Sequence, residues 1–74
     1  MNTLGTQLYI LRKKKRMSMQ ELAYELGVSK TAVGKWEAGT SKPSAVSLIK
    51  ICNFYHLNIQ QLSKEVKDLP ELLY

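Results

Sequence analysis

The side chains of this chain that are best suited to binding chemistry are its cations. Its 74 residues include eleven Lys and Arg against six Asp and Glu, which gives a formal net charge of +5. Five of the cations follow one another at residues 12–16, and Lys30 and Lys35 lie nearer the middle. Ammonium and guanidinium groups donate hydrogen bonds to anions such as phosphate. Residues 1–50 carry a net charge of +6 and residues 51–74 carry −1, so the first part of the chain favours a polyanionic partner.

Catalytic and metal-binding groups are sparse by comparison. The chain has one histidine, His56, one cysteine, Cys52, no glycine-rich phosphate loop and no cluster of carboxylates. A metal site needs several ligands at matched spacing, and none are spaced in that way. We interpret His56 as a helix-end residue and Cys52 as a small buried apolar residue. The pattern predicts a protein that is not an enzyme and that has no metal and no cofactor.

The composition also indicates the cellular compartment in which the protein is expected. A single cysteine cannot form an internal disulfide, which favours a reducing compartment. No apolar run approaches the ~20 residues that a membrane span needs, and the first residues lack a signal-peptide pattern. We therefore expect a cytoplasmic protein with no membrane partner. The length fits one small domain, near the lower limit at which a core holds itself together.

The central lysines need a scaffold, and residues 18–39 predict one made of two short helices. Ser18 and Glu21 have the spacing of a capping box, which opens a first helix over about 19–26. Apolar residues then recur at helical spacing and give this helix one buried face. Gly27 ends it, because a left-handed residue after a helix costs glycine almost nothing.

The second helix of the pair is predicted over about 29–37, with Ser29 as its N-cap. Its two sides differ in character. The residues expected to point inward are Ala32, Val33 and Trp36, and those expected to point outward are Lys30, Thr31, Gly34 and Lys35. Gly39 follows as the next stop signal. The sequence thus predicts a helix with an apolar inner side and a small, cationic outer side.

Further helices are predicted on either side of this pair. Residues 3 to about 15 carry an apolar stripe at helical spacing, and residues 44 to about 55 carry another. After Asn58 as an N-cap, a fifth helix is predicted over about 59–67. The tail at residues 69–74 is unusually apolar for a free end.

The basic run at residues 12–16 has two interpretations that the sequence leaves open. Cations at the end of the first helix complement its macrodipole and can be purely structural. Alternatively, the run forms a basic edge that faces phosphate groups. The apolar neighbours Tyr9 and Ile10 fall off the helical stripe, and they are either ordinary surface residues or a contact with a partner chain.

A capped helix, a glycine turn and a second capped helix form the layout of a helix-turn-helix. A closer resemblance lies in Leu22-Ala23, Gly27-Val28-Ser29, Val33, Trp36-Glu37, Gly39 and Pro43-Ser44. On these residues the chain, from about Leu4 to about Leu62, resembles the Cro/C1-type (Xre-like) helix-turn-helix family of bacterial and phage transcription regulators. The resemblance implies an all-α, compact five-helix, lambda-repressor-like DNA-binding domain over residues 1–68, followed by the apolar tail.

The outer side of the second helix is then the expected reading surface for bases in the major groove. Lys30 and Lys35 can donate to guanine O6 or N7, and the methyl group of Thr31 can pack on a thymine methyl. Gly34 would allow close approach to the groove. Contacts with the DNA backbone are expected from Ser29, Thr40, Ser41, Lys42, Lys13 and Gln20. The competing interpretation of the two lysines is an ordinary solvated helix face.

The resemblance also implies structural features and marks departures. Arg12 is expected to form a structural ion pair with Glu37, so that removing one partner strands a charge. Arg16 and His56 stand where the family often has glycine, which predicts mild backbone strain at Arg16. Met19 stands where the family often has a glutamine that touches phosphate, and Lys13 or Gln20 are expected to substitute for it.

One module makes few base contacts, so we expect a homodimer on a pseudo-palindromic operator with half-sites ~34 Å apart. The expected interface residues are Phe54, on the outer side of its helix, Ile59, Gln60, Leu69, Leu72 and Leu73. We predict sequence-specific binding of double-stranded DNA by a small transcription regulator acting as a repressor. The alternative is an antitoxin or regulatory partner protein, whose main contact is another protein and whose DNA binding serves autoregulation.

Overall fold

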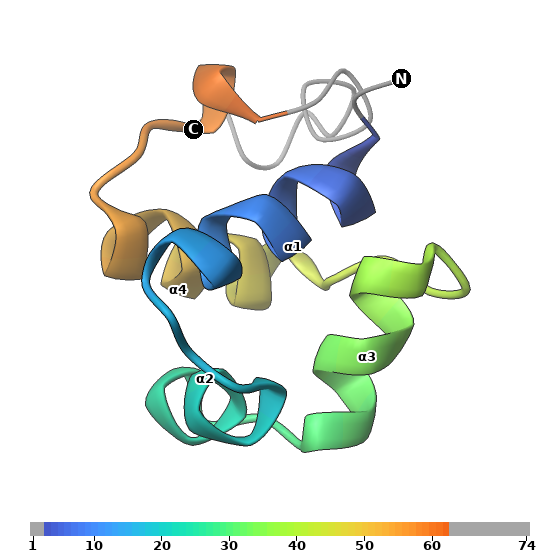
Figure 1. Ribbon diagram of the computed structural model, residues 1–74. Helices are drawn as coiled ribbons and strands as arrows, with labels where there is room; N and C mark the ends of the chain where they lie inside the picture. The colour runs from blue at the N-terminus through green and yellow to red at the C-terminus, as the bar shows by residue number, and fades with distance from the viewer. Residues whose placement is uncertain (1–2, 63–74) are drawn as a thin grey trace.

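The computed structural model describes residues 3–62, which form a compact arrangement of short helices (Figure 1). Its elements in chain order are α1 (Leu4–Lys14), α2 (Met19–Leu26), α3 (Lys30–Ala38), α4 (Ala45–Tyr55) and the 3-10 turn η1 (Ile59–Gln61). No strand occurs in this described part of the chain. The all-α class predicted from the sequence is therefore confirmed.

Each α-helix begins after a hydroxyl-bearing residue that accepts a hydrogen bond from the backbone of the first turn. The pairs are Thr3 with Thr6 N–H, Ser18 with Glu21 N–H, Ser29 with Ala32 N–H, and Ser44 with Ser47 N–H. These caps satisfy backbone donors that have no partner within a helix. The capping box of α2 is confirmed, because Ser18 N–H also donates to Glu21 Oε1 at 2.8 Å.

The helix ends follow equally simple rules. Gly27 and Gly39 adopt left-handed backbone at φ 69° and 81°, and they end α2 and α3 as predicted. The other two turns place non-glycine residues in the same region, Arg16 at φ 56° and His56 at φ 57°. Left-handed backbone brings Cβ close to the following carbonyl oxygen, so these two residues carry the strain that glycine avoids.

The predicted count of five helices is not what the described residues show. In place of the first part of the predicted helix at 59–67 there is a single 3-10 turn, and residues 63–67 lie outside the described residues. The reason is local hydrogen bonding. Asn58 Oδ1 accepts from Gln60 N–H at 3.1 Å, Asn58 O accepts from Gln61 N–H at 3.1 Å, and Gln61 Oε1 accepts from Asn58 N–H at 2.8 Å. These bonds close a tight turn with 3-10 spacing.

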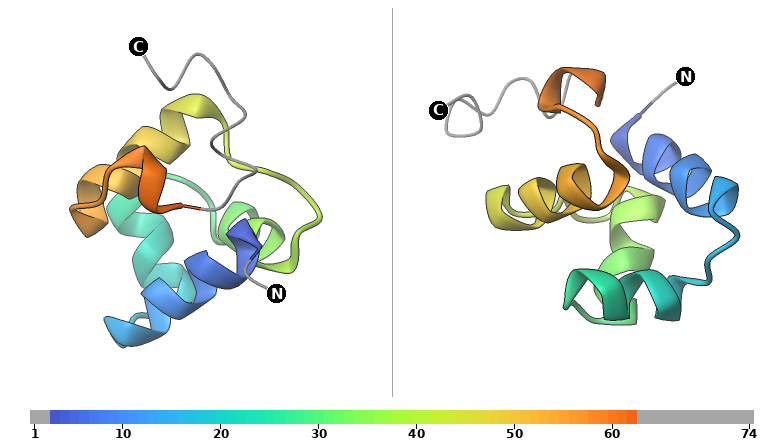
Figure 2. Two further views of the ribbon diagram at one scale, coloured as in Figure 1. Left: turned by 90° about the horizontal axis from the view of Figure 1, so that it is seen from above. Right: turned by 90° about the vertical axis from the view of Figure 1, so that its left-hand side faces the viewer.

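The core lies where α1 and α2 pack against α3, with α4 packed against α2. The most deeply buried apolar side chains come from all four α-helices, and η1 is followed by the buried Leu62. Trp36 is 7% exposed and belongs to this core, as predicted. In both Figure 1 and the right-hand view of Figure 2, η1 lies at the end of the molecule opposite α2. The α2–α3 unit is thus held in place by α1, which packs against α3, and by α4, which packs against α2.

A close approach between α1 and the end of α3 depends on Gly5. A Cβ built at this buried residue would lie 2.7 Å from the backbone oxygens of Trp36 and Glu37. Backbone cannot move aside as the end of a flexible side chain can, so any larger residue would push the two helices apart. The importance of Gly5 could not be predicted from the sequence, because a glycine within a helix gives no sign of what it faces.

Candidate nucleic-acid interface

The α3 helix lies along one edge of the molecule, with its N-terminus beside α2 (Figure 1). Its inner side is formed by Val33, which is fully buried, and Trp36. Lys30, Thr31 and Lys35 are all exposed. The described part of the protein therefore leaves these three side chains available to a partner while the tryptophan is turned into the core.

The three outward residues do not form a single straight stripe. At 3.6 residues per turn, Lys30, Thr31 and Lys35 span an arc of about 140° around the helix axis. Thr31 and Lys35, one turn apart, lie on nearly the same line, and Lys30 lies further round. Lys30 also lines a cleft that the other two do not line. The outer face of α3 is accordingly broad enough for contacts at more than one level of a groove.

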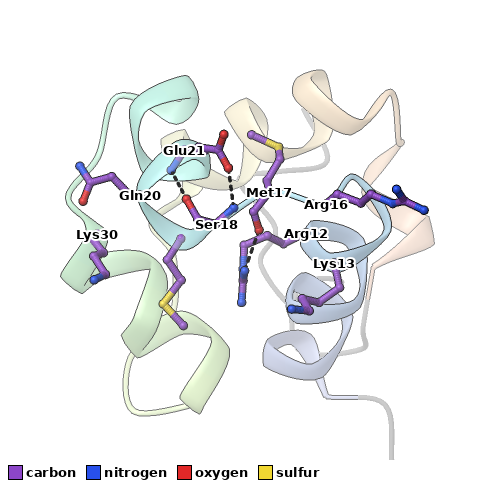
Figure 3. A pocket seen from close by; sticks show the side chains of 9 residues that line it. Arg12, Lys13, Arg16, Met17, Ser18, Gln20, Glu21 and Lys30 are labelled. Carbon is purple, nitrogen blue, oxygen red and sulfur yellow. Dashed lines mark hydrogen bonds between the residues drawn. The ribbon is translucent and has the colours of Figure 1, made fainter.

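This cleft, of about 800 Å³, lies between the end of α1, the start of α2 and the start of α3. Figure 3 shows Lys30 and Gln20 on one side of it and Lys13 and Arg16 on the other. All four side chains are exposed and three are cations. Its acidic residue, Glu21, is engaged by the backbone N–H of Ser18. The cleft is thus an electropositive hollow next to the first turn of α3.

Arg12 and Glu37 are brought together beneath this cleft. Arg12 Nε donates to Glu37 Oε2 at 2.8 Å and Nη2 donates to Oε1 at 3.0 Å, with side-chain exposures of 7% and 5%. A third bond runs from Nη1 to the carbonyl oxygen of Met17 at 2.8 Å. The hydrogen bond to Glu37 raises the pKa of Arg12, against the lowering that burial causes. The guanidinium therefore ties α1 to the end of α3 and to the loop that leads into α2.

Ser29 combines its capping role with a free donor. Its Oγ accepts the Ala32 N–H at 3.0 Å, and the residue is exposed. A serine hydroxyl has one proton to donate as well as lone pairs to accept with. Because capping uses only a lone pair, the proton remains available for an anionic oxygen at the N-terminus of α3.

The loop after α3 has most of its donors turned inward. The carbonyl oxygen of Lys35 accepts from Thr40 N–H at 3.0 Å, from Thr40 Oγ1 at 3.3 Å and from Ser41 N–H at 3.4 Å. Thr40 therefore has no free proton in this state. The Ser41 hydroxyl and the Lys42 ammonium are exposed and make no hydrogen bond or ion pair within residues 3–62. Of the three predicted backbone contacts in this loop, these two are the better placed.

Lys13 and Gln20 also keep exposed side chains at the cleft. Lys13 Nζ lies 5.9 Å from the ring centre of Tyr9, a cation–π distance, so the exposed Tyr9 has a partner within its own chain. Met19 is half-buried and lies against α3, where a Cβ built on Gly34 would be 3.7 Å from its sulfur. The missing side chain of Gly34 thus faces α2.

Three of the predicted dimer residues lie within the described part of the chain, on α4 and η1. The placement of Phe54 on the outer side of its helix is wrong, because Phe54 is half-buried and packs against the core. Its ring meets Tyr55 edge to face at 5.1 Å, and Lys15 Nζ lies 5.4 Å from its centre. Ile59 and the exposed Gln60 belong to η1. Leu69, Leu72 and Leu73 lie outside the described residues.

Searches for other kinds of site give little in residues 3–62. No group of three or more His, Cys, Asp or Glu side chains in this part could hold a metal ion. None of its helices has the length and apolar character that crossing a bilayer requires.

Comparison with known proteins gives one consistent result. A helix-turn-helix family model matches residues 8–62. The chain is 39% identical over 56 residues to the HTH-type transcriptional activator BcrR of Enterococcus faecalis, which covers 76% of this chain and 28% of that protein. It is 29% identical over 52 residues to the uncharacterized HTH-type transcriptional regulator YobD of Bacillus subtilis (strain 168), covering 70% of this chain and 46% of that one.

These matches span less than half of each relative's length. No solved structure matches the chain. The family match covers α2, α3 and α4 in full and most of α1, so it includes the cleft and the exposed face of α3. The chain belongs to the Cro/C1-type (Xre-like) helix-turn-helix family of DNA-binding transcription regulators.

Proposed function

We propose that this chain binds double-stranded DNA sequence-specifically by laying α3 in the major groove. The observation that carries the proposal is the two-sided character of α3, with Val33 and Trp36 buried and Lys30, Thr31 and Lys35 exposed. The major groove admits one α-helix, and its base edges present patterns that distinguish all four base pairs. A helix held by its apolar side leaves the opposite side for those edges.

In this arrangement Lys30 and Lys35 donate to guanine O6 or N7, and Thr31 packs on a thymine methyl. The arc of about 140° between the lysines lets them address base pairs at different levels of the groove. The backbone contacts come from Ser29 at the N-terminus of α3, from the loop residues Ser41 and Lys42, and from Lys13 and Gln20 beside the cleft, while Thr40 holds the loop against Lys35. Such contacts hold the helix in position and carry no sequence information themselves.

The regulator acts as a homodimer on a pseudo-palindromic operator, in our proposal, and represses by occupying a promoter. The interface is built from Phe54, Ile59, Gln60 and the tail at residues 69–74, beyond a binding domain at residues 1–68. The exposure of Gln60 supports this placement, and the half-burial of Phe54 leaves only part of its side chain for such a contact. The name of the Enterococcus relative describes an activator. A promoter–reporter assay distinguishes the two, since a repressor lowers expression from the selected site.

The experiment that tests base reading compares two kinds of lysine. Selection from a random duplex pool defines the preferred site of the wild-type chain, and Lys30→Ala, Lys35→Ala and Lys42→Ala are then measured on that site and on scrambled DNA. We expect the first two to reduce discrimination by about 1–3 kcal/mol per lost base contact. Lys42→Ala should weaken binding to both sequences equally. Equal losses on both sequences for all three variants would refute the base-reading role.

A second function has a specific observation in its favour. Val46 and Ile49, one turn apart on α4, are 63% and 51% exposed, and Tyr24 on α2 is 83% exposed. Exposed apolar residues of this size suit a protein contact. They favour the alternative of an antitoxin or regulatory partner that uses DNA binding for autoregulation. A neighbouring toxin or restriction gene would favour this alternative over the main proposal, because both readings include DNA binding and retardation of a duplex does not distinguish them.

A further inference from the structure

Two non-glycine residues of residues 3–62 have left-handed backbone, Arg16 and His56, and they sit at matching places in the fold. Each follows a helix, Arg16 after α1 and His56 after α4. Their φ angles, 56° and 57°, are nearly identical. Glycine adopts this conformation without the close contact between Cβ and the carbonyl oxygen. Arginine and histidine therefore occupy positions where the backbone conformation favours glycine.

The turn itself does not require an arginine side chain. Its conformation is held by backbone bonds, from Arg16 N–H to Lys13 O at 2.9 Å and from Met17 N–H to Arg12 O at 3.2 Å. The Arg16 side chain is exposed, and no hydrogen bond or ion pair of its guanidinium is found among the described residues. The arginine at this strained position therefore supplies an exposed cation at the turn between α1 and α2.

Arg16 lies at the rim of the electropositive cleft. Arg12 is neutralised by Glu37, so the cations of the cleft without a carboxylate partner in the described region are Lys13, Arg16 and Lys30. Figure 3 shows Arg16 on the α1 side, extending outward and away from Lys30 across the cleft. A duplex that meets Lys30 at the start of α3 would present further phosphates of the same strand beyond the cleft, toward α1.

We propose that Arg16 contacts a DNA phosphate at the outer rim of this cleft, and that the chain tolerates a left-handed arginine for that contact. The inference rests on the proposed function, because it assumes that α3 lies in the groove. Arginine suits the role, since its planar fork can bind two phosphate oxygens at once. The contact extends the binding surface from α3 and the start of α2 to the α1–α2 turn.

The test uses the full chain with Arg16→Gly, Arg16→Lys and the matched control His56→Gly. Both glycine variants relieve the same strain, so both should raise the denaturation midpoint. Binding is measured by fluorescence anisotropy at several salt concentrations, on a duplex short enough for one copy so that dimer formation does not contribute. We expect Arg16→Gly to lower affinity about three- to tenfold at low salt and to reduce the salt slope of log K by about 0.9, the value for one phosphate.

His56→Gly should leave both affinity and slope unchanged, and Arg16→Lys should keep most of the slope. If Arg16→Gly binds with wild-type affinity and slope, Arg16 is only a helix-end cation and the inference is wrong. If the wild-type chain itself fails to bind any duplex, the proposed function falls and this contact falls with it. A slope lost equally in His56→Gly would also overturn the inference, because the effect would then come from the backbone change.

Discussion

At the scale of single residues, two glycines within helices have opposite roles. Gly5 allows α1 to approach the backbone at the end of α3, where a Cβ would lie 2.7 Å from two carbonyl oxygens. Gly34 faces α2, where a Cβ would make an ordinary contact of 3.7 Å with the Met19 sulfur. Glycine within a helix costs roughly 1 kcal/mol relative to alanine, so its retention calls for a reason at each site. The reason at Gly5 is visible in the packing.

Alanine substitutions at the two glycines should therefore differ in sign. Gly5→Ala should lower the free energy of unfolding by roughly 1–3 kcal/mol, because overpacking must displace backbone. Gly34→Ala should raise it by up to roughly 1 kcal/mol, since the added methyl finds space and removes the helix penalty. Urea denaturation of both variants measures the difference. A loss of stability in Gly34→Ala would contradict the available space beside Met19.

Tyr55 provides a residue-scale prediction for pH. Its hydroxyl is buried without a hydrogen-bond partner among the described residues, and burial, with a smaller contribution from Glu37, raises the pKa from 10.0 to about 12. An unfolded tyrosine loses its proton first as the pH rises, so the free energy of unfolding should fall between about pH 10 and about pH 12. Below the unfolded pKa the group makes no pH-dependent difference.

The measurement is the difference between the wild-type chain and Tyr55→Phe, because other groups also titrate in this range. The wild-type chain should lose stability relative to the variant across that pH window. At neutral pH the variant should be equally stable or slightly more stable, since it removes an unpaired buried polar atom. Parallel stability curves for the two proteins would show that the hydroxyl finds a partner in solution.

At the scale of secondary-structure elements, the Arg12–Glu37 pair joins α1 to the end of α3, and it offers a sharp test of how the reading helix is held. Arg12→Met alone should cost about 3–5 kcal/mol of unfolding free energy, because it leaves the Glu37 carboxylate buried without its cation. The double variant Arg12→Met, Glu37→Leu should lose much less than the two single variants together. Denaturation of all four proteins gives this coupling energy, and additive losses would show that the two side chains act independently.

The elements that the sequence predicted best are those with local signals. Helix ends are marked by interactions confined to one turn, which here involve Ser18 with Glu21, Gly27 and Gly39. The structure has the capping box and both glycine C-caps at the predicted positions. The 3-10 turn at Ile59–Gln61 was missed, because Asn58 is as good a cap for a turn as for a helix, and the Gln61 side chain decided between them. Phe54 was misplaced because helical spacing alone cannot show that its ring packs against the core, with Lys15, the residue after α1, beside it.

The candidate site, like the fold, was predictable only where local sequence patterns determine it. The exposure of Lys30, Thr31 and Lys35 follows from the period of α3, and the burial of Trp36 follows with it. The cleft was not predictable, because it depends on how three helices meet. Nor does any sequence signal show that Thr40 directs its hydroxyl proton to the Lys35 carbonyl oxygen. Contacts that depend on tertiary distance need the fold before they can be assigned.

At the scale of the whole molecule, the cleft is separated from η1, which carries Ile59 and Gln60 of the proposed dimer surface. The cleft and the start of α3 lie near α2, and η1 lies at the opposite end of the molecule (Figures 1 and 2). Within the described residues the charge differs in the same direction, because residues 3–50 carry a net +6 and residues 51–62 contain no Asp, Glu, Lys or Arg. One end can therefore meet a polyanion while the other meets a second copy without charge repulsion.

Removal of residues 69–74 should weaken dimerisation. Burying even part of three leucine side chains is worth more than ~1.4 kcal/mol, so the dimer dissociation constant should rise at least tenfold. Sedimentation equilibrium of the full and shortened chains measures it, with Glu71→Gln as a control that alters the charge of the same segment but keeps its leucines. An unchanged monomer–dimer equilibrium would place the tail outside the interface.

The several hydrogen bonds that converge on the carbonyl oxygen of Lys35 have a mechanical consequence. Because the backbone N–H groups of Thr40 and Ser41 and the Thr40 hydroxyl all donate to this oxygen, the loop is tied to the last turn of α3. In the proposed complex the Lys42 ammonium rests on a DNA strand, and the tied loop then limits how far α3 can tilt. Operators with unusually narrow or wide grooves beside the loop would then misalign the helix against its bases, so local duplex shape becomes part of recognition.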